Sequence, residues 1–180
     1  MSGKDMKKSL GKTITLLFFT GMLIYYSASA AATNVSLDLG APISLSEFVL
    51  LTAEALDAPI IQSEAEMSAM RYAYKAGWIE TPEKDAAVTR EQAADILVIA
   101  SGNVIWPQDT VPFADEVDIS DNYEDAVSCA AKLGLVMGDP QGTFRPQDAL
   151  TYQEAGYLME RLKNMGIGSC MHLLPKELKA

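Results

Sequence analysis

The feature that most constrains the fold is a four-residue pattern that recurs just before runs of apolar residues. Its first residue is Ser or Thr and its fourth is Glu or Gln, as in a capping box, where each of the two side chains bonds the backbone N–H of the other residue. The pattern occurs as SLSE (44–47), SEAE (63–66), TREQ (89–92) and TYQE (151–154), and Asp121 with Glu124 is a looser fifth case. Five such signals predict a chain of short helices.

The apolar runs also end where helices should end. Gly77, Gly102, Gly134 and Gly166 follow them, and glycine readily takes the left-handed conformation that closes a helix. The start and stop signals together predict helices over residues 45–57, 64–76, 90–101, 122–133 and 152–164. No alternating strand pattern is long enough to compete, so the predicted fold class is all-α.

The order of these signals repeats along the chain. A helix, a glycine, an apolar pair, a loop, a capping box and a second helix follow one another in a second unit (64–101) and in a third unit (112–163). A first unit (41–57) keeps only the box and its helix. Short two-helix units cannot bury their apolar faces alone, which predicts one repeat domain over residues 33–166, followed by a tail (167–180).

The first 32 residues have the pattern of a secretory signal peptide. Four lysines precede the apolar run 14–26, and small residues follow it, with cleavage expected near Ala30 to Ala32. The run is shorter than the roughly 20 residues that span a bilayer. We therefore expect a secreted protein, with retention of the segment as an uncleaved anchor as the alternative.

Charge restricts the partners that such a chain could bind. Without residues 1–32 it has 10 basic and 23 acidic residues, a net charge of −13. This field opposes nucleic acid, so an anionic ligand would have to be held by a local cation. The two cysteines, Cys129 and Cys170, are too few for a disulfide framework and favour free thiols, although a pair stays open.

The residues offer little for catalysis or metal binding. The single histidine, His172, lies beyond the last predicted helix, which leaves no Ser-His-Asp, Cys-His or His-rich arrangement. A calcium loop that began at Asp139 would need glycine at its sixth position and a carboxylate at its twelfth, where this chain has Phe144 and Leu150. We expect no enzyme activity, no cofactor and no metal site.

Residues 112–162 resemble a complete S-layer homology repeat. The resemblance depends on an opening Phe-x-Asp, a Gly-x-x-x-Gly turn, a Gly-x-Phe-x-Pro loop and a Thr-x-x-Glu box, with Tyr where the family has Trp. The residues concerned are Phe113, Asp115, Tyr123, Gly134, Gly138, Gly142, Phe144, Pro146, Thr151 and Glu154. The second unit is similar to a repeat without that loop, and the first to the end of a repeat.

The resemblance implies a fold and a site. It implies a pseudo-threefold helical trefoil, here with an incomplete first repeat, and non-covalent attachment to secondary cell-wall polysaccharide, often pyruvylated. It also implies that the arginine of a Thr-Arg-x-Glu box contacts the anionic group in a groove beside the loop. The box position of that arginine holds Leu45, Arg90 and Tyr152. Arg90 is thus the predicted contact with the anionic group, and Tyr152 is a candidate for stacking on a sugar. Gly138 and Asp139, in the loop that borders the groove, are the other two predicted ligand contacts.

Two functions stay open at this point. In the first, the chain is a secreted, wall-associated module that binds acidic polysaccharide at Arg90. In the second, it is a degenerate repeat module that binds another exported envelope protein and no polysaccharide. The loss of arginine at two of the three boxes favours the second, and Arg90 could also pair with the neighbouring Glu91 instead of a ligand.

Overall fold

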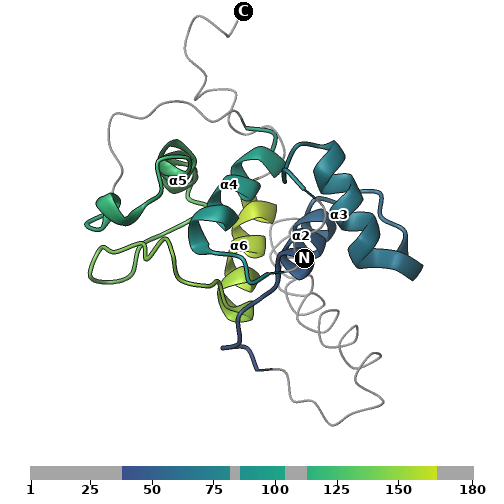
Figure 1. Cartoon of the computed structure of the whole chain (residues 1–180), viewed down its shortest axis with the longest axis horizontal. Helices are drawn as coiled ribbons and strands as arrows, with labels where there is room; N and C mark the ends of the chain where they lie inside the picture. Colours follow the sequence, from purple (N-terminus) through teal and green to yellow (C-terminus); the bar gives the residue numbers. More distant parts are fainter. Residues whose placement is uncertain (1–37, 82–85, 104–112, 166–180) are drawn as a thin grey trace, which may run out of the picture. The chain divides into compact units, whose positions relative to one another are not determined.

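A computed structural model describes residues 38–81, 86–103 and 113–165 (Figure 1). Contacts divide the chain into two parts, Met1–Asp38 and Leu39–Ala180, and the description below concerns Leu39–Ala180 alone. The predicted signal peptide, Gly166, Cys170 and the tail lie outside the described residues. None of the described helices has the length and hydropathy needed to cross a bilayer.

The described part of the chain is helical. Its α-helices are α2 (Leu45–Ala55), α3 (Ala65–Lys75), α4 (Arg90–Ala100), α5 (Glu124–Lys132) and α6 (Tyr152–Met165), with 3-10 turns at Gln62–Glu64 and Glu116–Asp118. No strand occurs within these residues beyond isolated bridges. The all-α prediction is confirmed, and every helix lies where the start and stop signals placed it, to within two residues at each end.

Three of the predicted capping boxes form, and they begin α2, α4 and α6. In each, the hydroxyl of the first residue accepts the backbone N–H of the fourth at 3.3 Å, and the fourth side chain accepts the backbone N–H of the first at 3.0 to 3.2 Å. The pairs are Ser44 with Glu47, Thr89 with Gln92, and Thr151 with Glu154. These helices are therefore fixed at their first residues by local hydrogen bonds.

The predicted boxes at 63–66 and at Asp121 with Glu124 are wrong. Ser63 lies inside a 3-10 turn, and α3 begins after Glu64 with no side-chain cap. α5 begins after Tyr123, also with no side-chain cap. A capping box needs an extended N-cap backbone, and the ψ angles of these two N-caps are 44° and −5°, against 160° and 163° for α2 and α4.

The helix ends agree with the glycine signals within the described residues. Gly77, Gly102 and Gly134 have φ angles of 76°, 75° and 72°, and each stands two positions after the last residue of its helix. An L side chain is strained in this region, which explains glycine at these three positions.

A ring of main-chain hydrogen bonds joins the three segments that precede the capped helices. The Ile43 N–H donates to Leu150 O (2.9 Å), the Leu150 N–H to Val88 O (2.8 Å) and the Val88 N–H to Ile43 O (3.1 Å). All three side chains are fully buried. The ring connects the first unit to the third, the third to the second and the second to the first.

A second set of three bonds joins the same units in the opposite direction, from the first residue of each capped helix. The backbone N–H groups of Leu45, Arg90 and Tyr152 donate to the carbonyls of Ala86, Asp148 and Ala41 at 2.8 to 3.1 Å. The same main-chain hydrogen bonds thus recur at all three boxes, and we call this arrangement the backbone frame. Because the frame repeats, residues at corresponding box positions in the three units can be compared directly.

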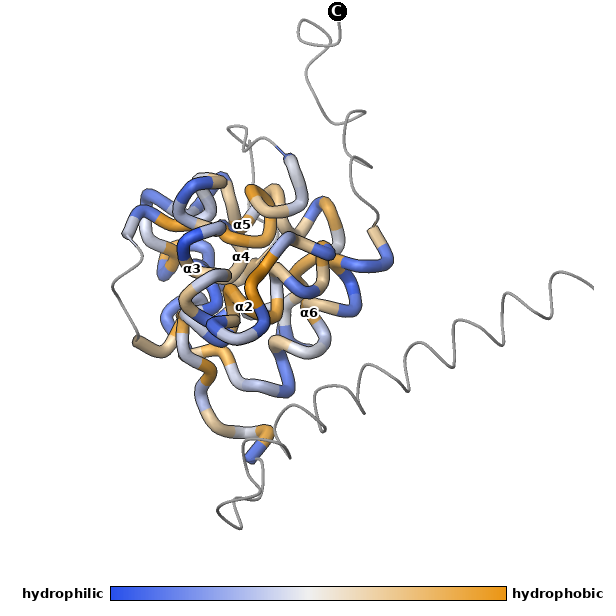
Figure 2. The backbone as a smooth tube through the Cα atoms, turned by 90° about the vertical axis from the view of Figure 1, so that its right-hand side faces the viewer, coloured by the Kyte–Doolittle hydropathy of each residue, from blue (hydrophilic) through white to orange (hydrophobic). Residues whose placement is uncertain are grey.

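The remaining helices lie on the outside of the capped ones. α3 packs on α2, and α5 packs on α4 (Figure 1). Each buries one face, and Figure 2 shows hydrophobic and hydrophilic residues alternating along the helices. The core beneath them includes Phe48, Leu97, Phe144 and Met159, each exposed by 1 % or less.

Candidate functional site

The site is built on the loop between α5 and α6, and two glycines shape that loop for different reasons. Gly142 has a φ angle of 82°, as a turn of this hand requires. Gly138 has no such angle, but a Cβ there would lie 3.0 Å from Thr143 O and 3.1 Å from the Phe113 ring. Any side chain at Gly138 would therefore push the two sides of the loop apart.

Asp115 fixes the loop from the start of the third unit. Its carboxylate accepts the backbone N–H groups of Phe144 and Arg145, each at 2.7 Å. Arg145 has a φ angle of 56°, which is uncommon for a residue other than glycine. The Phe113 and Phe144 rings stack nearby, with centroids 4.9 Å apart. The Phe-x-Asp motif therefore holds the Gly-x-Phe-x-Pro loop in place.

Asp139 closes the loop internally. Its carboxylate accepts the Thr143 hydroxyl (2.6 Å) and the backbone N–H groups of Gln141 (2.9 Å) and Thr143 (3.0 Å). These bonds, above all the one from the Thr143 hydroxyl, lower the pKa of Asp139 below its usual value. The residue is thus ionised near neutral pH, at the edge of the pocket described below.

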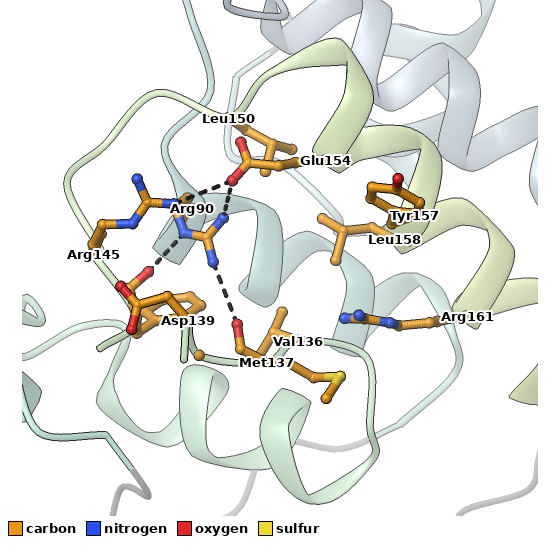
Figure 3. A pocket seen from close by; sticks show the side chains of 12 residues that line it. Arg90, Val136, Met137, Asp139, Arg145, Leu150, Glu154, Tyr157, Leu158 and Arg161 are labelled. Carbon is orange, nitrogen blue, oxygen red and sulfur yellow. Dashed lines mark hydrogen bonds and ion pairs between the residues drawn. The ribbon is translucent and has the colours of Figure 1, made fainter. Parts of the chain in front are cut away.

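Arg90 connects α4 to this loop and to α6 (Figure 3). Its Nη1 bonds Glu154 Oε1 at 2.6 Å, its Nε donates to Phe144 O at 2.6 Å, and its Nη2 donates to Met137 O at 3.4 Å. The guanidinium also lies over the Phe144 ring, 5.1 Å from the centroid. The side chain is only 12 % exposed, so most of its hydrogen-bonding capacity is used within the protein.

Glu154 is the acidic partner of two arginines. Burial raises its pKa, but hydrogen bonds from Thr151 and the charges of Arg90 and Arg145 outweigh that effect, so that the pKa of Glu154 lies below its usual value. The carboxylate is therefore ionised near neutral pH. It serves its own capping box through one oxygen and the arginines through the other.

The predicted alternative partner of Arg90, Glu91, has a different role. It is buried, and its carboxylate accepts the Ser120 N–H (3.0 Å), the Ser120 hydroxyl (2.9 Å) and the Gln147 amide (2.9 Å). Glu91 thus ties the start of α4 to the third unit, while its neighbour Arg90 points to Glu154.

An open pocket of about 210 Å³ lies beside Arg90. Its lining comes from α4, α6 and the segment between α5 and α6, and we name it the arginine pocket because it contains three arginines. It is lined by Arg90, Val136, Met137, Gly138, Asp139, Phe144, Arg145, Leu150, Glu154, Tyr157, Leu158 and Arg161. Of the predicted ligand contacts, Arg90, Gly138 and Asp139 meet here.

Tyr152, the fourth predicted contact, does not line this pocket. It is buried, and its hydroxyl donates to Glu47 Oε1 at 2.5 Å. Its contact corresponds to that of Arg90, because in both cases the first residue of a capped helix bonds the fourth box residue of the next unit in the ring. Leu45 and Gln92 are the third such pair, and an apolar side chain offers no hydrogen bond to an amide.

Sequence reasoning missed Arg145, Tyr157 and Arg161 as pocket residues. A signal for two of them was present, since Glu154, Tyr157 and Arg161 lie three and four residues apart and so share one face of a helix. Arg145 stands between the Phe and the Pro of the loop motif, and its place follows only from the folded loop. Among the described residues, no cluster of His, Cys, Asp or Glu is placed to hold a metal ion.

The fold and the pocket define an all-α repeat domain with a cationic site between two of its units. Comparison with known families agrees for the third unit: residues 112–155 match the model of the S-layer homology domain. The resemblance found in the sequence is thereby confirmed for that segment, which contains the loop, the box and the first residues of α6.

Two relatives share about half of the chain. It is 34 % identical over 100 residues to an amylopullulanase of Thermoanaerobacterium thermosulfurigenes, and 32 % identical over 110 residues to exoglucanase XynX of Acetivibrio thermocellus. These regions cover 51 % and 54 % of this chain, but only 5 % and 10 % of the two relatives. The similarity therefore concerns a small part of each relative.

Proposed function

We propose that this chain attaches non-covalently to bacterial cell-wall polysaccharide, and that the arginine pocket binds an acidic sugar of the polymer. The observation that carries the proposal is the gathering of three guanidiniums at one pocket beside the loop of the S-layer homology segment. Arg145 belongs to the matched residues 112–155, and Arg90 and Arg161 reach the pocket from outside them. In this proposal residues 1–32 direct export, and the three units form the pseudo-threefold trefoil of that family. The cyclic hydrogen bonds support the trefoil.

The local charge of the pocket favours an anion although the chain as a whole is acidic. Arg90, Arg145 and Arg161 outnumber the two acidic lining residues, Asp139 and Glu154, by one charge. A guanidinium can bind a carboxylate with two parallel hydrogen bonds. This excess concerns the lining side chains alone, since Asp148 pairs with Arg145 from outside the lining. Salt screens the more distant acidic residues over about 8 Å.

The rim of the pocket suits the ring of a sugar. Met137 and Tyr157 are 60 % and 53 % exposed, and both line the pocket. An exposed aromatic ring with a polar hydroxyl offers an apolar face and a hydrogen bond together. The volume is below the roughly 300 Å³ at which pockets for whole small molecules begin, which fits one sugar of a polymer better than a free cofactor.

Arg90, Arg145 and Arg161 together give the pocket its positive charge, and Gly138 and Asp139 lie at its edge. Tyr157 takes the stacking role that the sequence suggested for Tyr152, whose burial and bond to Glu47 favour a structural role instead. The names of the two relatives denote enzymes, but the matched parts are small, and we propose no catalytic activity for this chain.

Sedimentation with cell walls tests the proposal. The exported chain should pellet with sacculi that carry the polysaccharide and should stay in solution with sacculi from which it has been stripped. Replacing Arg145 and Arg161 by Ala should reduce pelleting at least tenfold, since two charged contacts are lost. In the matched control, Lys132 and Lys163 are replaced by Ala. This variant loses the same amount of charge, but at positions outside the pocket lining. Equal pelleting with both kinds of sacculi would contradict the proposal.

A partner protein is the second candidate, and one surface favours it. Met67 and Tyr74 of α3 are 50 % and 51 % exposed, and their spacing of seven residues puts them on one face of the helix. This candidate predicts that an envelope protein co-purifies with the chain and is lost on replacing both residues by Ser. It also predicts no pelleting that depends on the polysaccharide, so one preparation distinguishes the two functions.

A further inference from the structure

The three arginines of the pocket differ in how far the protein already satisfies them. Arg90 has contacts at all three of its nitrogens, including the 2.6 Å ion pair with Glu154. An incoming carboxylate at Arg90 would have to displace Glu154 or lie next to it. Both are costly, because the first removes the closer of the two arginines that pair with Glu154 and the second places two like charges together.

Arg145 also forms ion pairs within the protein, although weaker ones. It pairs with Asp148 at 3.2 Å and with Glu154 at 3.4 Å, and its side chain is 48 % exposed. Exposed pairs of this kind contribute little, so a ligand could replace them at low cost. However, the same two carboxylates would still repel an anion that approached Arg145.

Arg161 stands apart from these pairs. Its Nη1 donates to Leu135 O at 3.2 Å, and no ion pair to it is found in the part of the chain that the structure describes. One hydrogen bond to a carbonyl leaves most of the N–H donors of a guanidinium for a ligand. Within the described ranges, its positive charge is also not paired with a carboxylate.

The position of Arg161 suits a contact with a substituent on a sugar. In Figure 3, Arg161 extends into the pocket from α6 beside Val136 and Met137, on the side opposite Arg145 and Asp139. Tyr157 lies one helical turn before Arg161 on α6, and it is exposed. A sugar ring against Tyr157 and Met137 would place an acidic substituent near Arg161, away from Glu154.

We propose that Arg161 holds the carboxylate of the ligand, and that Arg90 positions the pocket instead of binding the anion. This inference rests on the proposed function, since it assumes that the pocket receives an acidic polysaccharide. It differs from the assignment made from the sequence, in which the arginine of the box is the anion contact.

The test compares wall polysaccharide with the same polymer after its carboxyl groups have been reduced to alcohols. The exported chain should bind the native polymer at least tenfold more tightly than the reduced one, as calorimetry can measure. Arg161→Gln should lose that preference, and its affinity for the native polymer should fall to the level of the reduced one. Arg161→Lys should keep a preference for the native polymer, because it retains the charge.

Two controls separate this contact from general effects of charge and folding. Lys163→Gln removes one charge from the same helix outside the pocket lining, and it should keep the full preference. Lys132→Gln removes one charge from α5, also outside the lining, and should keep it as well. A preference that persists in Arg161→Gln, or one that is lost equally in the two lysine variants, would overturn the inference while leaving wall binding intact. If the unaltered chain binds neither polymer, the proposed function itself fails.

Discussion

Two contacts in this domain occupy the same position in the backbone frame and differ in chemistry. Arg90 bonds Glu154 between the second and third units, and Tyr152 bonds Glu47 between the third and first. Both join the first residue of one capped helix to the box acid of the next. Only the first contact lies beside the loop held by Asp115, and there the pocket forms. The two positions are thus equivalent in the backbone, and the loop together with the side chains decides which of them borders a pocket.

The largest expected effect comes from breaking the first contact. Arg90→Ala would leave Glu154 without its closest cation and two loop carbonyls without a donor, so the free energy of unfolding should fall by about 3 kcal/mol. Urea unfolding measures this. Arg145→Ala, which removes only exposed pairs, should cost under about 1 kcal/mol. Equal losses in both variants would contradict a structural role for Arg90.

Loss of the support beneath the loop should have the next effect. Asp115→Ala removes the acceptor of two backbone N–H groups, those of Phe144 and Arg145, and should reduce the free energy of unfolding by about 2 kcal/mol. Hydrogen exchange should then increase at these two amides and remain low in α2. Unchanged exchange in the loop would show that Asp115 does not hold it.

The second contact should matter less. Tyr152→Phe removes one hydroxyl from Glu47 and keeps the buried ring, so the expected loss is about 1 kcal/mol, measured by urea unfolding. Binding to the wall polysaccharide should not change, because Tyr152 is not in the pocket lining. A clear loss of binding would instead restore Tyr152 as a ligand contact.

The smallest expected effect is the change of stability with pH that is linked to Asp95. Asp95 follows the first residue of its capping box, Thr89, at the same distance along the chain as Tyr157 follows Thr151. Burial, and secondly the charge of Glu80, raises the pKa of Asp95 to about 6. Because the folded-state pKa lies above the unfolded one, the stability linked to Asp95 is present at pH 4 and is lost as the pH rises through 6. After allowance for solvent screening, about 1 kcal/mol is at stake.

Thermal unfolding at pH 5 and pH 7 checks this prediction for Asp95. The unaltered chain should lose stability between the two pH values through this group, and Asp95→Asn should lose less. Glu80→Gln should shift the effect to lower pH, since it removes the neighbouring charge. An identical pH dependence in all three proteins would rule the linkage out.

What the sequence predicted well are features whose cause lies within a few residues. The capping boxes of α2, α4 and α6 join residues three apart. The glycines at 77, 102 and 134 each allow a positive φ angle at a single position. The loop motif was also visible, since its glycines, Phe144 and Pro146 stand close together. The predictions at 63–66 and 121–124 had the right residue types but not the extended N-cap backbone.

The site depended on contacts between residues far apart in the chain. Arg90 and Glu154 are 64 residues apart, and the ring that aligns their helices joins residues 43, 88 and 150. Local patterns cannot predict which box acid faces which arginine, or that Arg161 would enter the same pocket without an ion pair among the described residues. The sequence alone therefore determined the helices and the caps of α2, α4 and α6, because these depend on hydrogen bonds between near neighbours. Tertiary structure decided which side chains share a pocket, because only packing of the three units brings those side chains together.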